Sequence, residues 1–356
     1  MDPRIQAYAR VLVDCIDPRP GWQVSVRSQP PGRPLIEEIS RELARRGARA
    51  LVRLGFDPYG GPFLRYAPME LISTPSRIEL HEIENIDSYM AILAPDNTRA
   101  SGDIPAERLS ARQAALREPH LPFLMDEKPW VGCYYPTTAG AQDAGLPLPA
   151  FEDFLYGAVL IDWEELRARM ERIAEHFDHA ETVRIAGPET DLTFSLAGRE
   201  GKVDALGANM PGGEIFYSPV EDTAEGVISY LEYPACYLGH EVEGVRLRFE
   251  GGEVVDASAT ADEEFLLGAL DSDEGARRLG EFGIGCNPGI QRHMRNTLFD
   301  EKMEGTIHLA IGTGFPQIGG VNTSGIHWDM VKELRTGGRI ELDGKVVQEN
   351  GVWALS

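Results

Sequence analysis

The first half of the chain alternates between apolar runs and amphipathic segments in the manner of an α/β domain. Residues 23–28 (QVSVRS) predict a strand, and residues 34–46 (PLIEEISRELARR) predict an amphipathic helix that begins at Pro34 and ends before Gly47. Residues 48–55 (ARALVRLG) predict the next strand. Because a strand, a helix and a strand in this order form a right-handed crossover, we predict a partly parallel sheet.

The same reading extends this domain toward the middle of the chain. Residues 89–94 (YMAILA) and 130–135 (WVGCYY) predict strands, and residues 105–118 predict a helix. From Asp162 to His179 the spacing is helical, and one face carries four apolar side chains: Leu166, Met170, Ile173 and Phe177. We interpret that face as core packing.

The pattern changes after about residue 180. Short segments with a period of two predict strands at 182–186, 190–197, 227–233, 244–250 and 305–311, with glycine pairs between several of them and one helix at 260–270. We therefore predict an α/β N-terminal domain over residues 1–180. Residues 181–356 are predicted to form an α+β C-terminal domain with a bent, mainly antiparallel sheet.

Composition limits the classes of function. The chain has 356 residues, 42% hydrophobic and 26% charged, which is typical of a globular protein long enough for two domains. Its net charge of −23 argues against nucleic acid and anionic membranes as partners, because phosphate groups would be repelled. No apolar run approaches the roughly 20 residues of a membrane span, and the N-terminal segment does not resemble a signal peptide. Four scattered cysteines indicate reduced thiols and a cytoplasmic location: Cys15, Cys133, Cys236 and Cys286.

Five side chains in glycine-rich segments of the second half are candidate metal ligands. They are Glu214, Glu281, His308, His327 and Asp329. Carboxylates and imidazoles suit hard-to-borderline divalent cations. His327 and Asp329 are two residues apart, so on a strand their side chains share one face. We expect the C-terminal sheet to carry the site.

Charge balance favours two cations at such a site. Three carboxylates in one pocket would repel one another and raise their own pKa values. Two dications leave about one positive charge over three carboxylates, which a bound hydroxide could neutralise. We expect two divalent ions per chain, with Zn, Co and Mn as candidates.

Other motifs fail on their spacing. His240 and Glu241 resemble the start of a zincin helix, but the second histidine would fall at Gly244. The segment GIGCNPG at 283–289 resembles a nucleotide-binding loop, yet Pro288 blocks the helix start that would face the phosphates. The chain contains neither GK[ST] after a glycine-rich loop nor GxSxG.

Several segments taken in order resemble the thermophilic aminopeptidase family, also called aminopeptidase T. They are WVGCYYPTTAGAQDAG, FEDFLYGAVLID, GPETDLTFSL, NMPGGEIFYSP, GEFGIGCNPGI, NTLFDEKMEGTIHLAIG and IGGVNTSGIHWDMV. The resemblance implies a dinuclear metal-dependent exopeptidase whose ligands match the five candidates. It also implies an N-terminal α/β domain, a C-terminal domain that carries the metals, and a homodimer that encloses the active sites.

The chain departs from the family pattern at one position. Seven residues after His308 the family has an active-site tyrosine, and here the residue is Phe315. A missing phenol removes a donor that could stabilise a tetrahedral oxyanion, an effect of about 10–1000-fold in rate. Tyr217, three residues after Glu214, is the candidate for a replacement hydroxyl.

The predicted activity is removal of the N-terminal residue from short peptides or small amides by a metal-activated water. We expect Glu281 to bridge the two ions and Glu214 to be a ligand or a proton shuttle. The resemblance leaves two alternatives open. One is a recruited relative that carries out metal-dependent hydrolysis or oxygenation of a small aromatic compound, which should have lost some dinuclear ligands. The other is an inactive metal-binding homologue.

Overall fold

The computed structural model describes residues 2–56, 61–100, 102–125 and 127–354. Its internal contacts divide the chain into two units. Unit 1 consists of residues 1–161 and 206–211, and unit 2 consists of residues 162–205 and 212–356. The division therefore lies before the helix at 162–179, whereas the sequence analysis placed the boundary after it.

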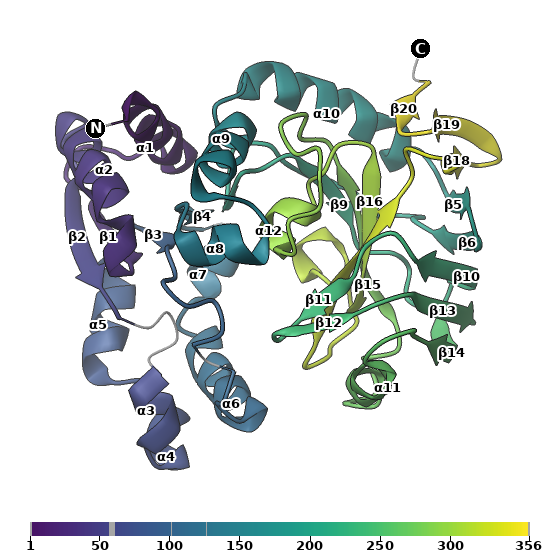
Figure 1. The fold of residues 1–356 in the computed structure, drawn as a ribbon, viewed down its shortest axis with the longest axis horizontal. Coiled ribbons are helices and arrows are strands. Elements are labelled where there is room, and N and C mark those ends of the chain that lie inside the picture. Colours follow the sequence, from purple (N-terminus) through teal and green to yellow (C-terminus); the bar gives the residue numbers. More distant parts are fainter. Residues whose placement is uncertain (1, 57–60, 101, 126, 355–356) are drawn as a thin grey trace. The chain divides into compact units, whose positions relative to one another are not determined.

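Unit 1 is built on a parallel sheet (Figure 1). Its strand order is β2-β1-β3-β4-β8, and every pairing in it is parallel. The strands are β1 (Gln23–Ser28), β2 (Arg49–Leu54), β3 (Ser88–Leu93), β4 (Trp130–Tyr134) and β8 (Asn209–Met210). The predicted strand-helix-strand unit is confirmed, with α2 (Arg33–Arg45) between β1 and β2. The late strand β8 brings residues 206–211 back to this unit.

Helices surround that sheet. The first, α1 (Pro3–Ile16), is capped by the Asp2 side chain, which accepts a hydrogen bond from the Arg4 N–H, and it buries Tyr8 and Leu12. The others are η1 (Pro30–Gly32), α3 (Gly61–Tyr66), α4 (Met69–Ile72), α5 (Arg77–Asn85), α6 (Ala106–Arg117), α7 (Leu121–Leu124), α8 (Thr138–Asp143) and α9 (Leu148–Val159).

Unit 2 contains two large antiparallel sheets where the sequence predicted one bent sheet. The eight-stranded sheet has the order β14-β13-β10-β6-β5-β18-β19-β20. Its strands are β5 (Thr182–Gly187), β6 (Thr190–Ser195), β10 (Glu225–Tyr230), β13 (Val245–Glu250), β14 (Glu253–Ser258), β18 (Arg339–Leu342), β19 (Lys345–Glu349) and β20 (Val352–Trp353). The antiparallel character is confirmed. The five predicted segments correspond to strands, but the periodicity gave neither the other strands nor their division between sheets.

The five-stranded sheet of unit 2 has the order β17-β16-β15-β9-β7. Its strands are β7 (Lys202–Asp204), β9 (Glu214–Tyr217), β15 (Leu279–Gly285), β16 (Thr306–Gly312) and β17 (His327–Glu333). Every residue of β15 and β16 is buried. Smaller elements complete the unit: β11 (Ala235–Tyr237), β12 (His240–Val242), α11 (Glu263–Leu270), α12 (Thr297–Asp300) and η2 (Pro316–Ile318).

The helix α10 (Trp163–Asp178) belongs to unit 2 because its apolar face packs on the five-stranded sheet (Figure 1). The four predicted core residues of that face are all buried. The ring of Phe177 lies 5.8 Å from that of Tyr217 on β9 and 5.9 Å from that of Phe282 on β15. This packing is why the helix lies with unit 2 and not with the residues that precede it.

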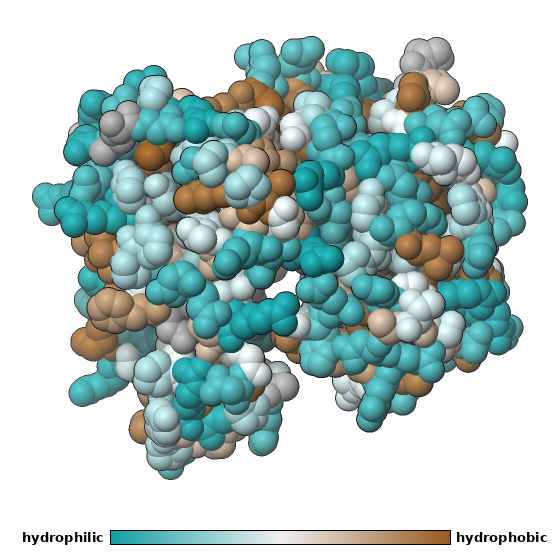
Figure 2. Space-filling view, viewed as in Figure 1, coloured by the Kyte–Doolittle hydropathy of each residue, from teal (hydrophilic) through white to brown (hydrophobic). Residues whose placement is uncertain are grey.

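The surface of both units is mainly hydrophilic on the face seen in Figure 2, where apolar residues form small separate areas. This agrees with the share of charged residues, 26% of the chain. Within the described ranges, no helix is both long enough and apolar enough to cross a membrane.

Candidate metal centre

Strand register brings the predicted ligands together on one face of the five-stranded sheet. Across β15, β16 and β17, Glu281 pairs with Ala310 and Ala310 pairs with Asp329. His308 lies opposite Gly283; each of these residues is two positions from the Glu281–Ala310 pair on its own strand. Because side chains alternate along a strand, these residues all project to the same side. Ala310 therefore lies between Glu281 and Asp329 in the register of the sheet, and its side chain is only a methyl group.

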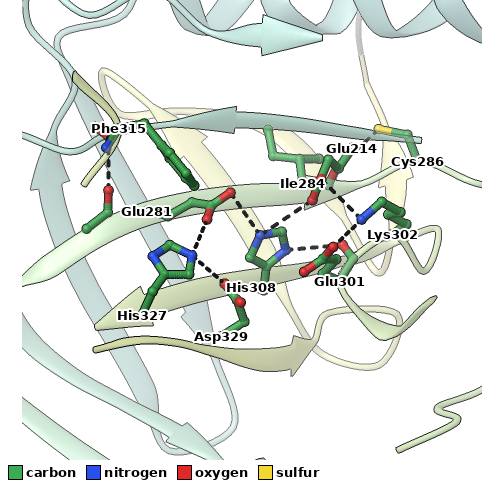
Figure 3. Close-up of polar contacts among 12 residues, drawn as sticks. Glu214, Glu281, Ile284, Cys286, Glu301, Lys302, His308, Phe315, His327 and Asp329 are labelled. Atoms are coloured by element: carbon green, nitrogen blue, oxygen red, sulfur yellow. Dashed lines mark hydrogen bonds and ion pairs between the residues drawn. The ribbon is translucent and has the colours of Figure 1, made fainter. Parts of the chain in front are cut away.

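Glu281 lies between the two imidazoles (Figure 3). Its Oε1 is 3.3 Å from Nε2 of His308, and its Oε2 is 3.0 Å from Nε2 of His327. Nε2 of His327 is also 3.5 Å from Oδ1 of Asp329. Glu281, His327 and Asp329 therefore form one set of three converging ligand atoms, hereafter the His327 group.

A second set of three ligands adjoins the first one. Glu214, Glu301 and His308 bring their ligand atoms within 4.8 Å of one another, and we refer to them as the His308 group. Nε2 of His308 is 3.7 Å from Oε2 of Glu214. Since Glu281 contacts both imidazoles, it connects the two groups.

Backbone carbonyls fix the orientation of both imidazoles. Nδ1 of His308 is 3.1 Å from the carbonyl oxygen of Glu301, and Nδ1 of His327 is 3.0 Å from that of Thr313. A ring whose Nδ1–H donates to a carbonyl presents Nε2 as the ligand atom. Both Nε2 atoms point at carboxylates of the cluster (Figure 3).

The pKa values of the imidazoles are shifted upward. Burial lowers the pKa of His308, but its hydrogen bond with Glu281 and the surrounding negative charges outweigh burial and raise that pKa to about 10. Burial likewise lowers the pKa of His327, and the charge of Asp329 leads the effects that raise it well above its ordinary value. Metal binding at these nitrogens therefore has to displace protons.

The pKa values of the carboxylates and of Lys302 are also shifted by burial and by the neighbouring charges. Burial raises the pKa of Asp329, but the charge of His327 outweighs it and lowers that pKa to about 2. For Glu301 burial dominates and raises the pKa to about 8 against the opposing charge of Lys302. Burial lowers the pKa of Lys302, but Glu214 and Glu301 raise it above its ordinary value. The cluster is thus a dense set of mutually dependent charges.

The residues present fit divalent cations. Oε2 of Glu214 and Oδ1 of Asp329 are buried and have no hydrogen-bond partner among the described residues. Each faces an imidazole Nε2 without a hydrogen bond, at 3.7 Å for Glu214 and 3.5 Å for Asp329, and a bound cation would satisfy both the oxygen and the nitrogen. With imidazoles neutral, the four carboxylates and the ammonium of Lys302 carry a net charge of −3. This equals the charge of the three carboxylates used in the sequence argument, so the balance with two dications is unchanged.

Tyr217 lies on the wrong face of the sheet for the role suggested from sequence. Its hydroxyl donates to Oδ1 of Asp178, 2.9 Å away, and is 3.1 Å from the carbonyl oxygen of Ala174, both on α10. Glu214 and Tyr217 are three residues apart on β9, so their side chains point to opposite faces. The structure gives Tyr217 a packing role beneath the site.

Phe315 lies beside the cluster, as the motif predicted. Its ring centroid is 5.2 Å from that of His327 and 5.3 Å from that of Phe216, on the site face of β9. Its backbone N–H donates to Oγ of Ser218 over 3.0 Å, which fixes the start of this loop. Phe315 therefore contributes an apolar wall next to His327 (Figure 3).

Sequence reasoning missed two residues of the cluster, Glu301 and Lys302. Both follow the short helix α12 in a turn, where strand periodicity gives no information about direction. The available signal was an adjacent acid and base, seven and six residues before His308, inside the segment NTLFDEKMEGTIHLAIG. A list of ligand-type residues in the family-like segments would have included Glu301.

Comparison with known proteins shows the family of the chain. A model of the thermophilic metalloprotease family (M29) matches residues 1–353. Aminopeptidase 2 of Geobacillus stearothermophilus is 26% identical over 99% of this chain and 98% of its own length. Aminopeptidase T of Thermus aquaticus is 31% identical over 62% of each chain.

Two solved structures have the same fold. The structure of wild-type AmpT from Thermus thermophilus superposes with a TM-score of 0.84 at 23% identity, covering 99% of both chains. The structure of a 2,5-dihydroxypyridine dioxygenase from Pseudomonas putida KT2440 gives a TM-score of 0.62 at 12% identity, covering 100% of this chain and 98% of the other. At these identities the likeness is one of fold.

The fold, the clustered carboxylates and imidazoles, and the match along the chain define a metal-dependent hydrolase. The chain belongs to the thermophilic metalloprotease family M29. The predicted family and the predicted class of enzyme, a metallo-aminopeptidase, are confirmed.

Proposed function

We propose that this chain removes single N-terminal residues from short peptides or small amides with two divalent cations. The observation that carries the proposal is the pair of three-ligand groups that Glu281 connects. Each group leaves coordination positions for water and substrate. The aminopeptidase names of the relatives support the choice of substrate.

The cations would be held by the His308 group and the His327 group, with Zn, Co and Mn as candidates. Bound divalent cations would supply Lewis-acid polarisation of the scissile carbonyl and a lowered pKa for a coordinated water molecule. Glu281 would bridge them, and the support for this role is that each of its oxygens faces a different imidazole. We assign Glu214 as a ligand through its Oε2, which has no hydrogen bond and faces Nε2 of His308.

Substrate would reach the cluster from the side of His327. The side chain of His327 is 26% exposed, whereas that of His308 is 1% exposed. The ring of Phe315 lies beside this partly exposed imidazole and would provide an apolar surface for a substrate side chain, and the buried ring of Phe216 packs against Phe315. The α-amino group of the substrate would then bind to a carboxylate of the cluster or to a cation.

The recruited alternative, chemistry on a small aromatic compound, is not favoured. It predicts the loss of dinuclear ligands, and here both groups are complete. The dioxygenase likeness is one of fold and carries no activity to this chain. The homodimer, the cytoplasmic location and the preference for short peptides stay predictions.

The function is tested with purified protein that has been stripped with a chelator and reloaded with Zn, Co or Mn. The loaded protein should cleave aminoacyl-anilides, the stripped protein should not, and added metal should restore the rate. N-acetylation of the substrate should abolish turnover, because the α-amino group loses its charge and its acceptor is left unpaired. Internal cleavage of acetylated peptides, or turnover of small aromatic amines without peptides, would contradict the proposal.

A further inference from the structure

The two ligand groups have the same composition but different neighbours. Each consists of two carboxylates and one imidazole. Lys302 contacts only the His308 group: its Nζ is 3.2 Å from Oε1 of Glu214 and forms an ion pair with Oε1 of Glu301 (Figure 3). The ion pairs of Glu281 and Asp329 are with imidazoles. Lys302 therefore acts most directly on the His308 group.

The ammonium of Lys302 is fixed in place. Its side chain is fully buried. The backbone on either side is held as well, since the Lys302 carbonyl accepts a hydrogen bond of 2.9 Å from the Asn287 N–H and the Lys302 N–H donates to the Phe299 carbonyl over 3.1 Å. The charge cannot turn toward water, where it would be screened.

This ammonium opposes a dication in two ways. It takes one oxygen from each carboxylate of the His308 group, leaving Oε2 of Glu214 as the oxygen without a hydrogen bond. It also places a positive charge in direct contact with both carboxylates that belong to that group alone, Glu214 and Glu301, whereas Glu281 faces both imidazoles and is shared by the two groups. A cation at the His308 group therefore meets a nearby ammonium that repels it, and a cation at the His327 group has no such direct neighbour among the described residues.

We propose that Lys302 makes the two metal sites unequal, so that the His327 group binds the first divalent cation tightly and the His308 group binds the second more weakly. This inference rests on the proposed two-cation site and adds an order of binding to it. The first cation is then the one nearest the exposed side of the cluster. Full activity requires metal concentrations that fill the weaker site.

The test is a metal titration of chelator-stripped protein with Co(II), followed by the visible absorbance of the bound ion and by calorimetry. Wild type should show two classes of site whose dissociation constants differ by about tenfold or more, which corresponds to about 1.4 kcal/mol. Lys302→Met should tighten the weaker class by about tenfold or more and bring the two constants together.

Lys332→Met is the matched control. Lys332 is also fully buried in unit 2, but its Nζ pairs with Glu232 at 2.9 Å, and it projects from β17 on the face opposite Asp329. Its removal should leave both dissociation constants as in wild type. Lys302→Arg keeps the charge and should keep the weaker site weak. Lys302→Gln replaces the methionine variant if circular dichroism shows that the latter does not fold.

The outcomes separate this inference from the proposed function. Two ions of equal affinity in wild type, or an unchanged ratio of constants in Lys302→Met, would overturn the role of Lys302 while leaving the two-cation site intact. A single ion in wild type and two in Lys302→Met would support the inference. A single ion in every variant would overturn the two-cation site itself, and the inference with it.

Discussion

Gly283 gives the most direct structural test of the site, because its missing side chain makes room for a ligand. On β15 it lies opposite His308 of β16. A Cβ atom added at Gly283 would lie 1.9 Å from Cε1 and 2.1 Å from Nε2 of that imidazole. The variant Gly283→Ala therefore places a methyl group where the ligand atom is.

The size of the effect follows from these distances. Ordinary van der Waals contact begins at 3.4 Å, so the ring or the strand has to move by about 1.5 Å. Metal–nitrogen bonds tolerate only about 0.2 Å, so a shift of this size removes His308 from the ligand set. We expect the loss of about one ion per chain, a fall in kcat of about 100-fold or more, and a decrease in the free energy of unfolding of about 1–3 kcal/mol.

Metal content by elemental analysis, kcat with an aminoacyl-anilide and thermal melting would measure the three effects. The control is Gly268→Ala on α11 of the same unit, where an added Cβ meets no atom within 4 Å. That variant should retain metal and activity. If Gly283→Ala kept two ions and the wild-type kcat, His308 would not be a metal ligand in the position shown. The assignment of the His308 group as a metal site would then be wrong.

Three other substitutions separate the roles of neighbouring residues. His327→Ala should lose metal and activity while it stays folded, since this imidazole is the most exposed ligand; full metal occupancy by elemental analysis would remove it from the ligand set. Phe315→Tyr should raise kcat/KM by about tenfold or more, mostly in kcat, if its phenol reaches the transition state; steady-state kinetics with an unchanged rate would show that the chain needs no such donor. Tyr217→Phe should lose about 1–2 kcal/mol in urea unfolding, because the bond to Asp178 is removed. A large drop in kcat without loss of stability would restore Tyr217 as a catalytic candidate.

The sequence was informative about the site wherever ligands lie on strands. His327 and Asp329 are two residues apart, so the alternation of side chains predicted that they share a face. The strand predicted at 305–311 is observed at 306–312, a shift that changes no side-chain direction. The same rule could have corrected the expectation for Tyr217, which is three residues from Glu214.

Other features depend on contacts between distant segments. The antiparallel strands of unit 2 form two large sheets, and α10 packs with unit 2. Both features depend on which strands become neighbours in the folded chain. Glu301 and Lys302 lie in a turn, and their side chains reach the cluster only because residues 287 and 302 are hydrogen-bonded across the fold. The pattern of apolar and polar residues along the chain gives no information about such pairings between distant segments.

By itself, therefore, the sequence determined the type of elements, the face of each ligand along its strand, and the family to which the chain belongs. The tertiary structure decided how the ligands divide into two groups, with Glu281 between them and Lys302 beside one. The physical reason is that strand alternation follows from the geometry of the backbone within a few residues. The electrostatic balance of a buried site, in contrast, depends on distances of a few ångströms between segments far apart in the chain.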